Sequence, residues 1–526
     1  MKKYLLFIIL LLLAAGLRLY QLGHIPASLN WDEAAIAWNS LSIWNARIDE
    51  YGTRLPLSFR SFGDFKAPLL IYATAPFVGL LGLKPWAVRL PSALAGIISV
   101  IIFYLLAQIT ASSFKKNKTF NEIFIILATL CFAISPWEIM FSRGAYEANV
   151  ALAFILFGFW LFLKSFEKWY LLLLSGLAFV ASMYTYHSAK LFVPLMILVL
   201  LIIYKNKIWV LVKQKTVGLF VIILICLAAF LPLAKENLYG KGADRFGTSI
   251  FFNQQQQLRL LDPGLLQDLA VNAWKQINPE FYLLGVKANY RNGLKYTGLI
   301  YPVVYLGFLF GLYALYQNRN KKISQLLLIW FLFGLVPGII SRGEEVPHPI
   351  RTLNAMPALI LIASYGLVTA YTSLGPKLLN KSKQKILLII FMAWLSFSFI
   401  KFIDDYFYKF PVYAAADWQY GYEQVAQVAK TYEDKVDKIV ISPYYGQPHI
   451  FIQVYQNKVP LYVLWGEMSK YQYRPVDWNG DQFQKNILLI GPPEEIPRQL
   501  PADKVTLIDE IRFPDNQVAF RIVKTL

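Results

Sequence analysis

Long apolar stretches recur along this chain, and they constrain its fold more than any other feature. The first is "YLLFIILLLLAAGL", which starts at Tyr4. Others of about 17–25 residues follow, the length at which a helix spans the ~30 Å hydrocarbon core of a bilayer. With 57% hydrophobic residues and a mean hydropathy of +0.45, the chain is far more apolar than a soluble protein of 526 residues. The sequence therefore predicts a polytopic α-helical membrane protein.

Eleven segments qualify as membrane spans. They are residues 4–20, 88–110, 121–137, 148–164, 169–186, 190–204, 216–233, 299–316, 323–340, 354–373 and 386–403. The N-terminal segment could pass for a signal peptide, but no convincing cleavage site ends it and many spans follow, so we expect a retained first helix. Cys131 and Cys226 lie inside apolar runs and read as buried small hydrophobes, with neither a disulfide framework nor metal-ligand spacing.

Basic residues set the expected orientation. The connections after the even-numbered spans, such as "SSFKKNK" and "KLLNKSKQK", hold nearly all the dense Lys/Arg clusters and only one acid, Glu167. The positive-inside rule puts them, together with the N-terminus, in the cytoplasm. The formal charge of +19 is then loop charge that orients the protein, and nucleic acid is not expected as a partner. The connections expected outside are residues 21–87, 138–147, 187–189, 234–298 and 341–353 and the tail from 404.

One apolar run, "APLLIYATAPFVGLLGL" at residues 67–83, is long enough to be a further span. If it crossed, every later Lys cluster would face outward, against the positive-inside rule. We therefore expect an interfacial or re-entrant helix on the outer face, broken by Pro68 and Pro76. The whole of 21–87 then forms one large outer loop.

The chain becomes more polar from about residue 404. "DKIVIS" and "NILLIG" have the composition of buried strands, "GYEQVAQVAKTYED" that of an amphipathic helix, and "KVTLIDEIRFPDNQVAFRIVK" that of a hairpin. These patterns predict a membrane domain over residues 1–403 and a small extracytoplasmic α/β domain over 404–526. The α/β domain has no Gly-rich phosphate loop, so nucleotide binding is not expected.

The expected outer loops hold a specific set of ionisable and aromatic residues, several of them close to the membrane. They are Asp32, Glu33, Arg54, Arg60, Asp64, Lys66 and Arg89 in the first loop, Arg143 and Glu147 in the second, Tyr184, Tyr186, His187 and Lys190 in the third, and Arg342, Glu344, His348 and Arg351 in the fifth. Ionisable residues at membrane depth are costly and mark functional sites. Separate cations suit the phosphate of an anionic lipid-linked substrate, and a carboxylate suits a general base for an acceptor hydroxyl.

Each of these signals also has a purely structural interpretation. Asp32 could be the N-cap of the helix "EAAIAWNSLSIW", with Glu33 placed favourably near the helix dipole. Arg89 and Arg143 could snorkel to lipid headgroups. Glu147 stands four residues after Arg143, the spacing of a helical ion pair.

Histidine and cysteine residues are the usual ligands of a tightly held metal. His187 and His348 are more often satisfied polar residues than ligands. No HExxH motif or His/Cys spacing indicates a tightly held metal, which leaves open only a divalent cation held by carboxylates.

The order of motifs resembles a known family. The aromatic-Asp-Glu motif after the first span is followed by "FGDFKAPLLIY", "AVRLPSALAGIISVIIFYLLA", "FSRGAYEANVALAFILFGFWLFLK" and "HPIRTLNAMPALIL". Over residues 1–375 this resembles the bacterial relatives of protein O-mannosyltransferases and of lipid A aminoarabinose transferases, which are GT-C class membrane glycosyltransferases. The motifs are fairly specific for the superfamily and not for a substrate.

This resemblance implies an enzyme that uses a polyprenyl-phosphate sugar and transfers the sugar with inversion on the outer face. Asp32 matches the general base, and Glu33 would position the acceptor or stabilise the environment of that base. Lys66 matches the lysine of the family's Lys-Pro-Pro-Leu segment and would contact the lipid phosphate. Here that segment reads Lys-Ala-Pro-Leu, so its first proline is missing.

The resemblance assigns further residues more loosely. Arg89 matches an arginine before Leu-Pro-Ser and is either structural or a contact of the donor phosphate, and Arg351 would be a second phosphate contact. Glu147 matches an acid that faces the site, and Arg143, Tyr186, His187 and His348 complete the expected surroundings. The β-trefoil module of the mannosyltransferases is absent, and the α/β tail takes its place. The acceptor class, whether protein, lipid or envelope glycan, therefore stays open.

Three other classes compete with this interpretation. A transporter or flippase of lipid-linked glycans would also need many spans, but transporters place key charges near the midplane and show inverted repeats. A ligase that uses a polyprenyl-diphosphate oligosaccharide would generally lack the acidic pair after the first span. A non-catalytic scaffold would leave the charges of the first loop unexplained.

Overall fold

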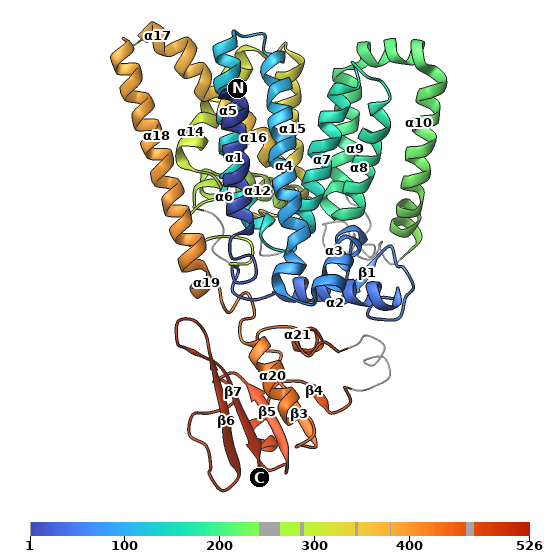
Figure 1. The fold of residues 1–526 in the computed structure, drawn as a ribbon, viewed down its shortest axis with the longest axis vertical. Coiled ribbons are helices and arrows are strands. Elements are labelled where there is room, and N and C mark those ends of the chain that lie inside the picture. The colour runs from blue at the N-terminus through green and yellow to red at the C-terminus, as the bar shows by residue number, and fades with distance from the viewer. Residues whose placement is uncertain (1, 241–262, 285–288, 342–345, 379, 459–467) are drawn as a thin grey trace. The chain divides into compact units, whose positions relative to one another are not determined.

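The computed structural model describes residues 2–526 except 241–262, 285–288, 342–345, 379 and 459–467 (Figure 1). The low-complexity run "QQQQ" at residues 254–257, together with Arg342 and Glu344, lies outside the described residues. The chain forms two compact units. The helical unit comprises residues 1–20, 65–69 and 92–405, and the mixed unit comprises residues 21–64, 70–91 and 406–526. The C-terminal region thus belongs to the same unit as most of the first loop. The predicted division of the chain at residue 404 does not include this grouping.

Each of the eleven predicted spans is a helix. These helices are α1 (Lys2–Leu19), α4 (Pro85–Ser113), α5 (Lys118–Ala133), α7 (Glu147–Lys164), α8 (Leu171–Thr185), α9 (His187–Ile203), α10 (Lys205–Tyr239), α14 (Pro302–Gln317), α15 (Lys322–Ile339), α16 (Met356–Thr369) and α18 (Lys381–Ile403). Within the described residues, six helices are each long and apolar enough to cross a membrane, and α5 with α6 (Pro136–Ser142) forms a bent pair that would make a seventh. The prediction of a polytopic helical membrane protein is confirmed.

Shorter elements occupy the connections. They are α2 (Trp31–Ala46), β1 (Phe59–Ser61), β2 (Asp64–Lys66), α12 (Pro263–Ile277), α13 (Pro279–Leu283), η2 (Leu353–Ala355), η3 (Ala370–Leu374), α17 (Gly375–Leu378), η4 (Asp404–Lys409) and α19 (Phe410–Tyr413). The helix α12 was not predicted. It packs against α15, where the Asn272 side chain donates to the carbonyls of Ile339 and Ser341, each at 3.0 Å.

The apolar run at 67–83 forms one helix, α3 (Pro68–Leu81). Its 14 residues extend about 21 Å at 1.5 Å per residue, less than the ~30 Å of a hydrocarbon core. Because the predicted spans α8 and α14 have only 15 and 16 residues, this length does not distinguish α3 from a span, and its interfacial position stays a prediction. The expected break is absent, because Pro68 begins the helix and Pro76 lies within it.

The C-terminal region is a small α/β domain, as predicted. Its strands are β3 (Lys438–Ile441), β4 (Tyr471–Tyr473), β5 (Ile487–Gly491), β6 (Val505–Arg512) and β7 (Val518–Thr525), and its helices are α20 (Tyr422–Tyr432), α21 (Pro448–Tyr455) and α23 (Trp478–Asp481). The sheet order is β4-β3-β5-β7-β6, with β4, β3 and β5 parallel and the β6–β7 hairpin antiparallel. Every residue of β5 is buried, which explains its continuous apolar sequence. The missed strand, β4, has only three residues.

Two glycines bring α14 and α16 into close contact in the helical unit. A Cβ at Gly311 would lie 2.0 Å from the carbonyl oxygen of Ile362, and a Cβ at Gly366 would lie 2.2 Å from that of Gly307. Gly307 and Gly311 form the small-xxx-small spacing that lets membrane helices approach closely. The α14–α16 packing therefore requires the absence of side chains here.

We expect Gly311→Ala to destabilise the protein by about 1–3 kcal/mol, because the added methyl forces the two helices apart. The measurement is the thermal unfolding midpoint of the purified protein in detergent. The matched control is Gly16→Ala, whose Cβ would meet nothing within 4 Å, so it should be neutral. Equal midpoints for the two variants would contradict this account of the packing.

In the mixed unit, the segment after α2 meets the start of α21 through two titratable groups. Oε1 of Glu50 lies 4.0 Å from Nε2 of His449, and the Glu50 side chain is only 9% exposed. Burial raises the pKa of Glu50 to about 7, with a smaller contribution from Asp49, and burial also lowers the pKa of His449. Because the folded protein holds the Glu50 proton more tightly than the unfolded chain, ionisation of Glu50 costs stability as the pH rises from 4.5 toward 7.

Glu50→Gln should therefore be more stable than the parent at neutral pH and nearly equal to it near pH 4.5. The advantage should reach on the order of 3 kcal/mol at pH 7 and above. His449 is present in both proteins, so its own titration is common to them and only its interaction with the Glu50 charge differs. Unfolding midpoints from pH 4.5 to 9 check the expectation, with the exposed Glu494→Gln as control. An advantage that does not change with pH would count against it.

Candidate functional site

The start of helix α2 is fixed by Asn30, not by Asp32. The Asn30 side-chain oxygen accepts from the N–H groups of Asp32 at 2.9 Å and Glu33 at 3.0 Å, and Glu33 Oε2 accepts from the Asn30 N–H at 3.2 Å. This reciprocal arrangement is a capping box. The N-cap interpretation of Asp32 is therefore wrong. Asp32 is the second residue of the helix, partly exposed, where the helix dipole favours a carboxylate.

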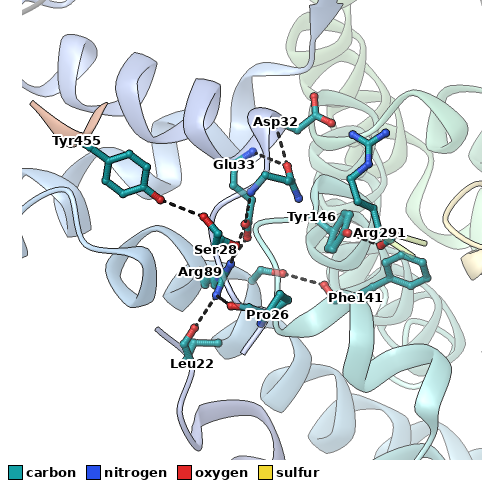
Figure 2. Close-up of polar contacts among 12 residues, drawn as sticks. Leu22, Pro26, Ser28, Asp32, Glu33, Arg89, Phe141, Tyr146, Arg291 and Tyr455 are labelled. Atoms are coloured by element: carbon teal, nitrogen blue, oxygen red, sulfur yellow. Dashed lines mark hydrogen bonds and ion pairs between the residues drawn. The ribbon is translucent and has the colours of Figure 1, made fainter. Parts of the chain in front are cut away.

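Glu33 points the other way, into a buried ion pair with Arg89 (Figure 2). Nε and Nη2 of Arg89 donate to the two carboxylate oxygens of Glu33, each at 2.9 Å. The exposed fractions of the two side chains are 0% and 1%. A buried carboxylate with a bidentate guanidinium partner is a strong structural contact.

Arg89 also closes the chain segment before α2. Its Nη1 donates to the carbonyls of Leu22 and Pro26, each at 3.0 Å, and its Nη2 donates to the carbonyl of Ser28. With the two bonds to Glu33, all five N–H groups of the guanidinium are used.

Two expectations about these residues are corrected. Arg89 has no N–H left for a lipid phosphate and is fully buried, so it neither binds the donor phosphate nor snorkels to headgroups. Glu33 is committed to the capping box and to Arg89, so it holds the helix instead of meeting an acceptor. Asp32 is the more exposed of the two acids, and it lies outside the capping box and the Arg89 ion pair.

In the helical unit, Lys66 is the last residue of β2. Next to it lies a chain of hydrogen bonds through His187 and Lys190, called here the His187–Lys190 relay. His187 Nε2 lies 3.1 Å from the carbonyl oxygen of Phe65, and Lys190 Nζ lies 3.2 Å from His187 Nδ1 and 2.8 Å from Asn237 Oδ1. Because a lysine ammonium only donates, Nδ1 of His187 accepts and Nε2 carries the proton that it donates to Phe65. The first residues of α9 thereby fix the backbone that carries Lys66, whose exposed fraction is 8%. Tyr186, which is buried, precedes this helix.

Arg143 and Glu147 belong to two different helices. Arg143 follows the last residue of α6, and Glu147 is the first residue of α7. Their spacing suggested an ion pair along one helix, but no single helix contains both residues. Arg143 Nη1 donates to the carbonyl of Leu17 at 2.8 Å, and the side chain is fully buried, so it does not snorkel.

Two residues that the sequence did not single out join connections of the helical unit. Trp137 Nε1 donates to the carbonyl of Pro349 at 3.1 Å, and the Tyr146 hydroxyl donates to the carbonyl of Arg291 at 2.7 Å (Figure 2). The only sign of these contacts in the sequence was the group of aromatic residues within "SPWEIMFSRGAY". The first bond joins the segment before Glu147 to the segment that carries His348 and Arg351, and the second joins it to the segment around Arg291.

His348 and Arg351 lie in one tight turn. The carbonyl of His348 accepts from the N–H of Arg351 at 3.2 Å and from the Thr352 hydroxyl at 3.2 Å. His348 is buried, and Arg351 is partly exposed. Across the described part of the chain, no group of three or more His, Cys, Asp or Glu side chains lies close enough to hold a metal ion.

Comparison with known proteins gives the fold. No protein-family model matches the sequence, and neither does any curated protein. The solved structure of ArnT from Cupriavidus metallidurans bound to undecaprenyl phosphate is similar, with a TM-score of 0.57 at 13% identity over 99% of this chain and 97% of that one. Apo ArnT gives 0.56 at 12% identity with the same coverage. The oligosaccharyltransferase AglB from Archaeoglobus fulgidus, in complex with an inhibitory peptide and a dolichol-phosphate, gives 0.51 at 12% identity over 98% of this chain and 74% of that one.

At these identities the likeness concerns the fold. It extends over nearly the whole chain, including the C-terminal α/β domain, which lies beyond the residues that carry the sequence resemblance. The chain therefore has the fold of the GT-C membrane glycosyltransferases, as the order of its motifs predicts.

Proposed function

We propose that this protein is an inverting glycosyltransferase that moves a sugar from a polyprenyl-phosphate donor to an acceptor hydroxyl on a protein, a lipid or an envelope glycan. The observation that carries the proposal is the position of Asp32. It is a partly exposed carboxylate in the first turn of a helix whose capping and ion pairing are done by Asn30 and Glu33. The shared fold supports this assignment, because ArnT binds undecaprenyl phosphate and AglB binds dolichol-phosphate.

In this proposal the reaction takes place on the outer face of the cytoplasmic membrane. The N-terminus and the Lys-rich connections are cytoplasmic, and the C-terminal domain is extracytoplasmic. The basic clusters of the sequence support that orientation.

The chemistry follows from one base and one departing phosphate. The acceptor hydroxyl gives its proton to the Asp32 carboxylate as its oxygen forms a bond to the anomeric carbon. The bond between that carbon and the phosphate oxygen breaks on the opposite face, so the configuration inverts. The polyprenyl phosphate leaves with both bonding electrons and an added negative charge.

Cations stabilise the charge on the leaving phosphate. Lys66 is the first candidate, because β2 ends at it and the His187–Lys190 relay holds the adjacent carbonyl. Arg351 is the second, since it is partly exposed in a tight turn. A fixed ammonium or guanidinium near the phosphate is worth most where water is excluded.

Asp32→Asn tests the base directly. The amide keeps the size of the side chain but cannot take the proton, so we expect turnover to fall by about 100-fold or more. The measurement is transfer of radiolabelled sugar from a panel of polyprenyl-phosphate sugars in proteoliposomes. Asp515→Asn, in the exposed β6–β7 turn, is the control. Turnover near the parent value in Asp32→Asn would sink the assignment, and labelled lipid that crosses the bilayer without being consumed would indicate a flippase.

Lys66→Ala tests the donor side. Loss of a charge-assisted contact to the lipid phosphate should raise the KM for the donor by about tenfold or more. Lys66→Arg should recover part of the loss, and Lys84→Ala, an exposed lysine, should change nothing. A donor KM that is the same in Lys66→Ala and in the parent would remove Lys66 from the phosphate site.

A further inference from the structure

Within the mixed unit, the C-terminal region reaches back to the first turn of α2. The backbone N–H of Trp31 donates to Oε1 of Gln419 at 3.2 Å, across 388 residues of sequence. The Ser28 and Tyr455 hydroxyls lie 3.4 Å apart (Figure 2). The segment that carries Asp32 is thus held from a distant part of the chain.

Gln419 completes the cap of this helix. The first N–H groups of any helix lack intrahelical partners. Here Asn30 satisfies those of Asp32 and Glu33 with its side chain and that of Ala34 with its carbonyl. The N–H of Trp31 is the one that Asn30 does not reach, and Gln419 accepts it.

Gln419 is itself tightly fixed. Its exposed fraction is 3%, and its Nε2 donates to the carbonyl of Asp417 at 2.8 Å. Its backbone is left-handed, with a φ of 48°, which is uncommon for a residue other than glycine. The neighbouring Trp418 places its ring 5.6 Å from the Arg89 guanidinium carbon. Adjacent residues therefore contact the cap of α2 and the partner of Glu33.

A second contact comes from the loop after β3. Gly446 has a φ of 113°, and a Cβ there would lie 2.3 Å from the ring of Trp31. Only glycine can lie this close in this backbone conformation. The Tyr422 hydroxyl anchors the loop, at 3.4 Å from the carbonyl oxygen of Ser442 and 3.3 Å from that of Gly446. The carboxyl end of a sheet strand thus packs on the residue that precedes Asp32.

We propose that the C-terminal domain is a working part of the active site, in which Gln419 acts as a positioning residue for Asp32. Through Gln419 the domain accepts the hydrogen bond of the Trp31 N–H, which completes the N-terminal cap of α2. Through Gly446 it packs against the ring of Trp31, the first residue of that helix. This inference rests on the proposed role of Asp32 as base. It assigns to the domain the task of holding that carboxylate in register with the acceptor hydroxyl, and it does not require the domain to bind substrate.

The consequence for catalysis is specific. Misplacement of a reacting group by about 1 Å can cost about 100-fold in rate. Loss of the Gln419 bond should let the first turn of α2 fray, which moves Asp32 while leaving the donor phosphate site untouched. The expected signature is therefore a lower kcat at an unchanged donor KM.

The test uses full-length protein with three substitutions at buried glutamines. Gln419→Ala removes the acceptor, and Gln419→Glu keeps an acceptor oxygen at a helix N-terminus, where negative charge is favourable. Gln456→Ala is the control, because Gln456 bonds only to its own domain in the contacts described, at the carbonyl of Ala426 and the Tyr471 hydroxyl. The readouts are kcat and donor KM in the transfer assay, and amide hydrogen exchange of peptides that cover residues 28–38.

For Gln419→Ala we expect kcat to fall about tenfold with donor KM within about twofold, as for a small displacement of a reacting group. Amide exchange in the first turn should speed up by about tenfold, the size expected for a lost capping bond. Gln419→Glu keeps the acceptor for Trp31 but loses the bond to the Asp417 carbonyl, so it should lie between the parent and Gln419→Ala in both readouts. Gln456→Ala should lower the unfolding midpoint and leave kcat unchanged.

Other results would overturn the proposal. Unchanged exchange in Gln419→Ala would show that the bond does not hold the helix. An equal loss of kcat in Gln456→Ala would show that the effect is general destabilisation of the domain. If the parent transfers no sugar from any donor, the proposed function fails, but the exchange measurement still decides whether Gln419 holds the first turn of α2.

Discussion

The connection between α1 and α4 depends on one buried guanidinium. Arg89 uses its five N–H groups on Glu33 and on the carbonyls of Leu22, Pro26 and Ser28, so it ties α4 to the start of α2 and to the chain that precedes it. Removal of one partner from a buried pair costs about 3–5 kcal/mol, because the other charge is left without compensation. The pair therefore holds the first turn of α2, which Asn30 caps, against α4, and with it the residue next to Glu33, Asp32.

This arrangement divides the work between two adjacent acids. Glu33 is taken up by the capping box and by Arg89, while Asp32, one residue earlier, faces a different side of the helix. Capping by Asn30 and Gln419 accounts for the first N–H groups of the helix through residues other than Asp32. A carboxylate at a helix N-terminus that is not consumed as a cap is a reasonable base for an acceptor hydroxyl, and it gives a physical reason for an acidic pair so near a membrane.

Local sequence signals predicted the elements well. The eleven spans, α3 and the strands β3, β5, β6 and β7 all follow from apolar length, period and turn residues. The capping box was also readable, since Asn30 stands three residues before Glu33. The partners of Arg89 and the cap from Gln419 were not, because nothing local in the sequence joins Arg89 to positions 56–67 residues before it, or Gln419 to a position 388 residues before it. The motif match predicted that Arg89 binds the donor phosphate. Only the structure showed that all of its N–H groups already bond to Glu33 and to nearby carbonyls.

The central claim is that Glu33 stabilises the start of α2, while Asp32 acts as the general base. The most direct test compares the thermal unfolding midpoints of Glu33→Gln and Asp32→Asn in the same detergent. The account predicts a clear fall for Glu33→Gln, because Arg89 loses its buried counter-charge, and a midpoint for Asp32→Asn close to that of the parent. A stable Glu33→Gln beside an unfolded Asp32→Asn would contradict it.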